Sequence, residues 1–98
     1  MDTSTAALAP ASPSEISATG GVGQATLTWR NPASPNLSYV RVWRNTLDDF
    51  GTATDITGEV VGGLGEVMSL DDTGLAADDY WYWVVAYNAG DVGSAPAL

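Results

Sequence analysis

The sequence contains no cysteine, no histidine and no lysine. Without cysteine or histidine, the chain cannot form a zinc finger, an iron–sulfur site, a thiol nucleophile or a Ser-His-Asp triad. Three arginines stand against twelve acidic residues, which gives a formal net charge of -9. Three cations cannot neutralise many phosphates, so we expect no nucleic-acid partner. No stretch approaches the roughly 20 apolar residues of a membrane span, so we expect no membrane partner either.

The 98 residues are enough for one small domain, and four tryptophans and four tyrosines argue against a disordered acidic tail. Residues 1–14 are small, polar and proline-containing, which predicts a flexible linker, and residues 15–96 are predicted to form the domain. The lack of cysteine fits the cytosol or a cysteine-free extracellular module. No basic segment precedes the short apolar run near the start, so no signal peptide is expected. The Ser/Thr/Ala/Pro tract after Met1 indicates a module excised from a larger protein.

Short apolar runs separated by Gly, Asn, Asp and Pro predict an all-β domain. In residues 24–30, Ala25, Leu27 and Trp29 alternate with polar residues, so one face of this strand is expected to be buried and the other wet. The whole pattern predicts a seven-stranded antiparallel sandwich of two sheets. The expected strands are 16–19, 24–30, 39–44, a weak run within 53–61, 66–70, 80–88 and a short edge at 92–95, with loops at 31–36 and 46–51.

Motifs spread from Pro13 to Pro96 resemble a fibronectin type III module, an immunoglobulin-like sandwich. The matching residues are Pro13, Leu27-Thr28-Trp29, Val42-Trp43-Arg44, Asp72-Thr73-Gly74-Leu75, the run Tyr80-Trp81-Tyr82-Trp83-Val84-Val85-Ala86-Tyr87-Asn88, Gly90 and Gly93-Ser94-Ala95-Pro96. The Asp-Thr-Gly-Leu turn, the Tyr-rich strand and the closing Gly-x-x-Gly-Ser are similar to copies in bacterial and phage proteins. The Val-Trp-Arg-Asn strand followed by Asp-Asp-Phe-Gly-Thr-Ala resembles modules in phage tail-tip and host-specificity proteins.

This resemblance places Trp29 in the core between the two sheets, about 10 Å apart. Leu75 and Tyr80 are expected at the corner before the sixth strand, with the tyrosine hydroxyl bonded back to the chain a few residues upstream. The other side chains expected to point inward are Tyr82, Val84 and Ala86 on the sixth strand, Val40 and Val42 on the third, and Met68 and Leu70 on the fifth.

Paired carboxylates are the only candidates for catalysis. They occur at Asp48-Asp49, Asp71-Asp72 and Asp78-Asp79, all of which fall at predicted turns. Aspartate in a turn commonly bonds its own backbone, and we favour that reading over a weak calcium site or glycosidase-type acid/base chemistry. The glycines of residues 62–65 are not a phosphate loop, because no helix and no lysine follow. We therefore predict no catalytic, metal or cofactor-binding residues.

The aromatic strand 80–88 carries the one feature that suggests a binding site. Period two puts Trp81 and Trp83 opposite the inward set, and Tyr39, Arg41 and Trp43 of the third strand are expected on the same outer face. One interpretation is a surface ladder with Arg41 stacked on the indoles. A second is an interface with a neighbouring domain or subunit, since Trp, Tyr and Arg are enriched in hot spots. A third is stacking on a sugar.

The resemblance implies a non-catalytic structural or adhesion module of a larger protein. The host is expected to be a phage or prophage tail protein, in which the domain spaces its neighbours and contacts adjoining subunits or a host-surface protein or glycan. The alternative is an accessory module of a secreted polysaccharide-degrading enzyme, acting as linker or carbohydrate contact. The expected location is accordingly the virion tail, or the extracellular space as part of a parent protein.

Overall fold

The structure is a computed structural model that describes residues 8–97. Its regular elements are strands, apart from one short 3-10 helix that follows the third strand. The elements are β1 (Ser14–Gly21), β2 (Gln24–Arg30), β3 (Tyr39–Asn45), η1 (Phe50–Thr52), β4 (Thr54–Asp55), β5 (Val67–Thr73) and β6 (Trp81–Tyr87). None of the described helices is long and apolar enough to cross a membrane.

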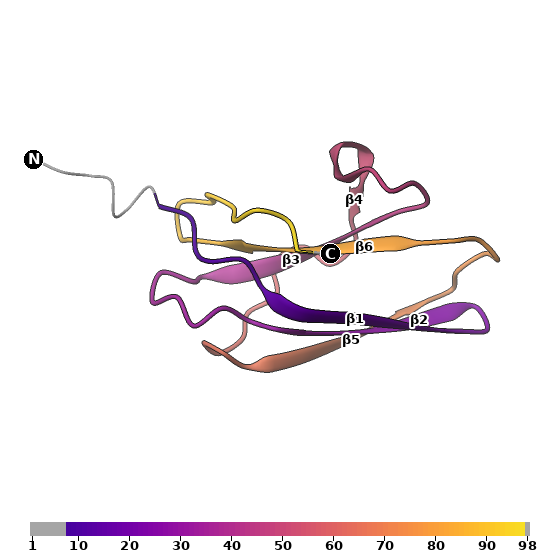
Figure 1. The fold of residues 1–98 in the computed structure, drawn as a ribbon, viewed down its shortest axis with the longest axis horizontal. Helices are drawn as coiled ribbons and strands as arrows, with labels where there is room; N and C mark the ends of the chain where they lie inside the picture. The colour runs from indigo at the N-terminus through magenta and orange to yellow at the C-terminus, as the bar shows by residue number, and fades with distance from the viewer. Residues whose placement is uncertain (1–7, 98) are drawn as a thin grey trace, which may run out of the picture.

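The strands form two antiparallel sheets that face each other (Figure 1). One sheet has the order β1-β2-β5 and the other has the order β4-β3-β6. The predicted all-β sandwich is therefore confirmed. Among the described residues six strands form rather than seven, because the segment expected at 92–95 pairs with β6 only through isolated bridges. These bridges join Tyr87 to Gly93 and Val84 to Ala97.

The core lies between the sheets and follows the alternation predicted for β2. Leu27 and Trp29 are buried, as are Val42 of β3 and Val84 of β6. The buried indole N–H of Trp29 donates to the Oδ1 atom of Asn31 at 2.9 Å, which satisfies a polar group that would otherwise cost free energy. Trp29 thus has the interior position expected from the sequence.

The corner before β6 also has the expected form. Leu75 packs against the core, and the Tyr80 hydroxyl donates to the Ala76 carbonyl at 2.8 Å. The backbone N–H of Leu75 donates to the carbonyl of Gly23, whose φ of +68° closes the β1–β2 hairpin. These bonds hold the corner against the hairpin tip.

One prediction about the strands is wrong, and another is confirmed as a very short strand. The fifth strand was expected to end at Leu70, with Asp71 and Asp72 in a turn, yet β5 continues through both aspartates to Thr73. Asp72 faces inward, where an arginine and a tyrosine bind its carboxylate, so the buried charge is compensated. The weak run within 53–61 contributes only the two-residue β4 and a bridge between Val40 and Val60.

Part of the expected linker lies against the domain. Residues 1–7 fall outside the described residues, but the Leu8 carbonyl accepts hydrogen bonds from the side-chain amides of Asn36 (2.9 Å) and Asn88 (2.8 Å). The Ala11 N–H donates to the Ser34 Oγ atom, and the Ser12 Oγ atom donates to the carbonyl of residue 95. Residues 8–13 are therefore attached to the body before β1 begins.

Candidate functional site

The pairing of β3 with β6 brings the predicted aromatic residues to one face of the sheet. Trp43 lies opposite Trp83, Arg41 opposite Val85, and Tyr39 opposite Tyr87. Side chains that lie directly opposite in an antiparallel pair share a face, so these residues form the outer-face cluster expected from the alternation. Trp81, the fifth candidate, pairs with Asn45 at the end of the same face.

Phe50 of η1 covers one end of this cluster. Its ring meets Trp43 edge to face at a centroid distance of 5.4 Å and Trp83 at 5.8 Å. Trp83, beneath this ring, is only 5% exposed, and Tyr39, at the other end of the cluster, is only 7% exposed, whereas Trp43 and Trp81 keep partial exposure. The outer-face cluster is therefore largely buried and resembles a small second core, not an open aromatic patch.

The turn that carries Phe50 is held by aspartate and asparagine, as the turn interpretation of Asp48-Asp49 predicts. The Asp49 carboxylate accepts from the Gly51 N–H and from the Thr52 hydroxyl. The Asn45 side chain donates to the Asp49 carbonyl at 2.7 Å and to the Thr52 hydroxyl at 2.8 Å. Asp49 thus holds the loop that places Phe50, and the sequence did not reveal that Phe50 covers the cluster.

Arg41 occupies the other end of the outer-face cluster. Its guanidinium lies 5.3 Å from the ring centroid of Tyr39 and 5.6 Å from that of Tyr87, and the two rings are stacked on each other at 5.2 Å. The expected cation–π contact is present, but it is made with tyrosines and not with indoles. Arg41 contacts these two rings because the register of β3 and β6 places Tyr39 beside Tyr87.

Carboxylates surround the same guanidinium. Arg41 Nη1 lies 2.8 Å from Asp55, and Arg41 Nη2 lies 3.7 Å from Glu59 and 4.0 Å from Asp91. Burial acts to raise the pKa of Asp55, but hydrogen bonds from Arg41 and from the backbone of Gly58 and Thr57 outweigh it, so the net shift is downward. The pKa of Arg41 is raised, first by its hydrogen bond to Asp55. Arg41 is thus already engaged within the molecule.

The indole N–H of Trp43 is buried, and no residue in the part of the chain that the structure describes accepts a hydrogen bond from it. Such a group gives up its bond to water without replacement, at a cost of about 1–3 kcal/mol. Phe50, a ring with no acceptor atom, covers the indole from the side of η1. The rings of Trp43 and Phe50 therefore pack together at the cost of one hydrogen bond that the Trp43 indole N–H could make with water.

A second cluster joins the two sheets in the interior and was missed from the sequence. Arg44 of β3 donates through Nη1 to both carboxylate oxygens of Asp72 on β5, at 3.0 and 2.8 Å. The Tyr82 hydroxyl donates to the same carboxylate at 2.8 Å, and the Tyr80 ring lies 5.6 Å from the Arg44 guanidinium. Burial raises the pKa of Tyr82, and its bond to Asp72 raises it further. This network links the sheets rather than forming an open site.

The remaining acidic pair behaves as turn material. The Asp79 N–H donates to the Asp78 Oδ1 atom, and both residues are exposed before β6. In residues 8–97 there is no group of three or more His, Cys, Asp or Glu side chains that could hold a metal ion. The described acids therefore lie in turns and loops and in the strands β1, β4 and β5, and several of them pair with the arginines.

Comparison with known proteins found a solved structure with a similar fold. No family model matches the sequence, and no curated protein does. A solved structure described as that of an Fn3-like protein from Clostridium thermocellum aligns with this chain at a TM-score of 0.62 and 29% sequence identity, covering 93% of this chain and 88% of the other. The fold is fibronectin type III-like. A fibronectin type III-like domain fits a non-catalytic module, in agreement with the class of function expected from the sequence.

Proposed function

We propose that this domain is a non-catalytic spacer and adhesion module of a phage or prophage tail protein. The path of the chain carries the proposal. The N-terminal segment reaches β1 at the end of the sandwich where β6 finishes, and residues 93–97 run back along β6 from Tyr87 to Val84, toward the opposite end (Figure 1). A chain that enters at one end and heads for the other suits modules arranged end to end.

The docked segment 8–13 supports a fixed spacing. The bonds to Leu8, Ala11 and Ser12 tie this segment to two loops and to the C-terminal run, so the chain enters the domain from a fixed point at residue 8. A Ser/Thr/Pro tract without such bonds would behave as a flexible tether. The module therefore acts as a spacer through these side-chain bonds.

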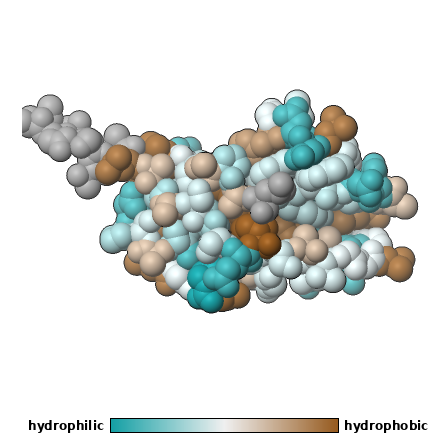
Figure 2. Space-filling model, viewed as in Figure 1, coloured by the Kyte–Doolittle hydropathy of each residue, from teal (hydrophilic) through white to brown (hydrophobic). Residues whose placement is uncertain are grey.

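Adhesion would use the outer-face cluster of Tyr39, Arg41, Trp43, Trp81 and Trp83. Phe50 covers Trp83, and Tyr39 is buried beneath Arg41, so the partly exposed members are those left to touch an adjoining subunit, a host-surface protein or a glycan. The hydrophobic residues visible in Figure 2 lie in separate groups among hydrophilic ones. Contact through the outer-face cluster would rest on its few partly exposed members.

Two measurements test the proposal. Nitrogen-15 relaxation should show residues 8–13 as rigid as β2, and Asn36→Ala should loosen them; fast motion of this segment in the unaltered protein contradicts the spacer role. An antibody against the domain should label tails of phage particles induced from the source strain. A parent reading frame that encodes a polysaccharide hydrolase instead would favour the accessory-module alternative.

A further inference from the structure

The loop between β3 and β4, residues 46–53, lies on the outer face of its sheet and is fastened there by one aromatic ring. Every hydrogen bond described for this loop has both partners within residues 45–53. Residues 46–49, 51 and 52 are exposed, and the half-buried Phe50 ring contacts Trp43 and Trp83. Figure 1 shows the loop outside the layer of β3 and β6, on the side away from the other sheet.

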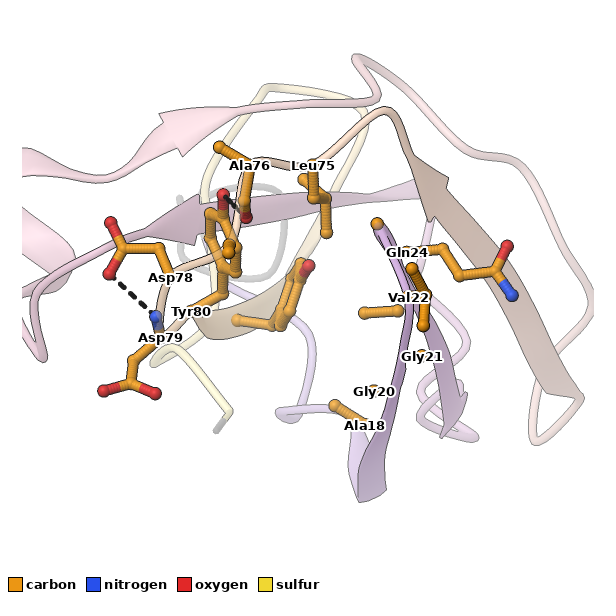
Figure 3. A pocket seen from close by; sticks show the side chains of 14 residues that line it. Ala18, Gly20, Gly21, Val22, Gln24, Leu75, Ala76, Asp78, Asp79 and Tyr80 are labelled. Atoms are coloured by element: carbon orange, nitrogen blue, oxygen red, sulfur yellow. Dashed lines mark hydrogen bonds between the residues drawn. The ribbon is translucent and has the colours of Figure 1, made fainter.

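The corner loop before β6 is attached differently. The Leu75 N–H donates to the carbonyl of Gly23 in the β1–β2 turn, and the Leu75 side chain packs against the core. The Tyr80 hydroxyl closes this loop through the Ala76 carbonyl (Figure 3). Within the described chain, no hydrogen bond of this kind joins residues 46–53 to a distant segment. The loop that carries Phe50 can therefore move about its two ends without breaking a hydrogen bond to the body of the domain.

Beneath Phe50 lies a two-by-two array of three indoles and one amide. The register of β3 and β6 places Trp43 opposite Trp83 and Asn45 opposite Trp81, all on the outer face. The closed loop engages three of the four, because Phe50 covers Trp43 and Trp83 while the Asn45 amide donates to the loop at 2.7 and 2.8 Å. The Trp43 indole N–H stays buried without an acceptor among the described residues. Opening of the loop would return this donor to water, which offsets part of the packing that opening gives up.

We propose that residues 46–53 form a lid whose opening exposes the array of Trp43, Asn45, Trp81 and Trp83 to an uncharged glycan. The flat faces of a pyranose ring carry C–H groups that stack on indole rings. Its hydroxyls can accept from the Trp43 N–H and bond to the Asn45 amide, so the array offers both an apolar platform and the few polar groups that orient a ligand. In the closed state the Phe50 ring occupies the place of one sugar ring.

The charge of the lid indicates which glycans fit. Asp48 and Asp49 lie exposed on the lid, and the whole chain has a formal net charge of -9, so an anionic glycan would be repelled. This inference rests on the adhesion role proposed above and names the class of partner that the outer-face cluster takes. The spacer role, which depends on residues 8–13, does not depend on it.

The probes are cellohexaose and hexa-N-acetylchitohexaose, titrated into the nitrogen-15-labelled full chain. Phe50→Ala removes the competing ring and should bind at least one of them about tenfold more tightly than the unaltered protein, the gain expected if the lid is open about a tenth of the time. Binding should shift the indole resonances of Trp43 and Trp81. Adding Trp81→Thr to Phe50→Ala should weaken binding at least about tenfold. Leu47→Ala, which truncates a side chain of the same loop that is 62% exposed, should leave the affinity unchanged.

A measurement on the unaltered protein decides the question if Phe50→Ala fails to fold. Relaxation dispersion should show residues 46–52 and the indoles of Trp43 and Trp83 exchanging at one common rate, and a saturating hexasaccharide should suppress this exchange. Flat dispersion profiles over the loop would overturn the lid. Equal gains in affinity from Phe50→Ala and Leu47→Ala would also overturn it, because the gain would then not come from uncovering the indoles.

A folded Phe50→Ala protein that binds neither hexasaccharide overturns the glycan as the occupant. If that protein still binds an adjoining tail subunit or host cells, and Trp81→Thr abolishes the binding, the adhesion role stands and a protein is the partner. If the domain binds none of these, the adhesion role proposed above fails together with this inference.

Discussion

Removing the carboxylate of Asp72 should destabilise the domain by about 3 kcal/mol. The Asp72→Ala change deletes a charge-assisted contact of Arg44 Nη1 with both carboxylate oxygens and a charge-assisted hydrogen bond from the Tyr82 hydroxyl, each worth about 1.5 kcal/mol at the lower end of the usual range. The upper end of the range for a buried pair, about 5 kcal/mol, is not expected, because the Arg44 side chain is 29% exposed and can regain water.

Urea unfolding followed by tryptophan fluorescence measures this loss, and a thermal scan should show a midpoint lower by about 12–24 °C. Tyr82→Phe should cost only about 1.5 kcal/mol, since it removes one hydrogen bond to the carboxylate and leaves the ion pair. Replacing both charged partners by Arg44→Met and Asp72→Leu should cost clearly less than the sum of the single changes.

A loss below about 1 kcal/mol for Asp72→Ala would refute the reasoning, because it would give the pair the strength of an exposed salt bridge. A double variant whose loss equals the sum of the two single losses would show that the arginine and the aspartate act independently. Either result would show that this network does not hold β3 and β5 together.

Three further predictions concern pH and the outer face. The pKa of Tyr82 is raised in the folded state, so the stabilisation that depends on its neutral hydroxyl is complete below the unfolded pKa of 10.0. The free energy of unfolding should therefore fall as pH rises above this value. Tyr82→Phe should remove that fall, as measured by urea unfolding at each pH. The pKa of Asp55 is lowered in the folded state, so the stabilisation from its carboxylate is present above the unfolded pKa of 3.8 and is lost as pH falls through the folded pKa. Asp55→Asn should flatten the loss of stability at acidic pH. An unchanged loss would contradict the assignment. Trp83→Thr should cost about 3 kcal/mol in denaturant unfolding because its ring is buried under Phe50, whereas Trp81→Thr should cost under about 1 kcal/mol; equal losses would show that Phe50 does not cover Trp83 selectively.

The alternation in β2 was enough to predict that strand to the residue, because its inward and outward positions differ in polarity at every step. The Tyr80 corner could be predicted because its bond closes over four residues of the same chain. Both features could be predicted from residues close together in the sequence and from the resemblance. Neither prediction required knowing which residues far away in the sequence they contact.

Asp72 and Phe50 could not be placed in the same way. An aspartate beside another aspartate is typical of a turn, and only Arg44, 28 residues away, makes burial of Asp72 tolerable. Phe50 lies in a turn that was predicted correctly, but the direction of its ring depends on how that turn folds back over β3 and β6. The members of the candidate site were therefore predictable from strand period, whereas their exposure was not.

The attachment of residues 8–13 has a mechanical consequence. A pull applied at the N-terminus meets the bonds to Leu8, Ala11 and Ser12 before it loads the ladder between β1 and β2. Six residues released from these bonds can straighten to a span of at most about 20 Å while the sandwich stays folded. A row of such domains under tension would lengthen in small steps and shorten again when the force drops, with every core intact.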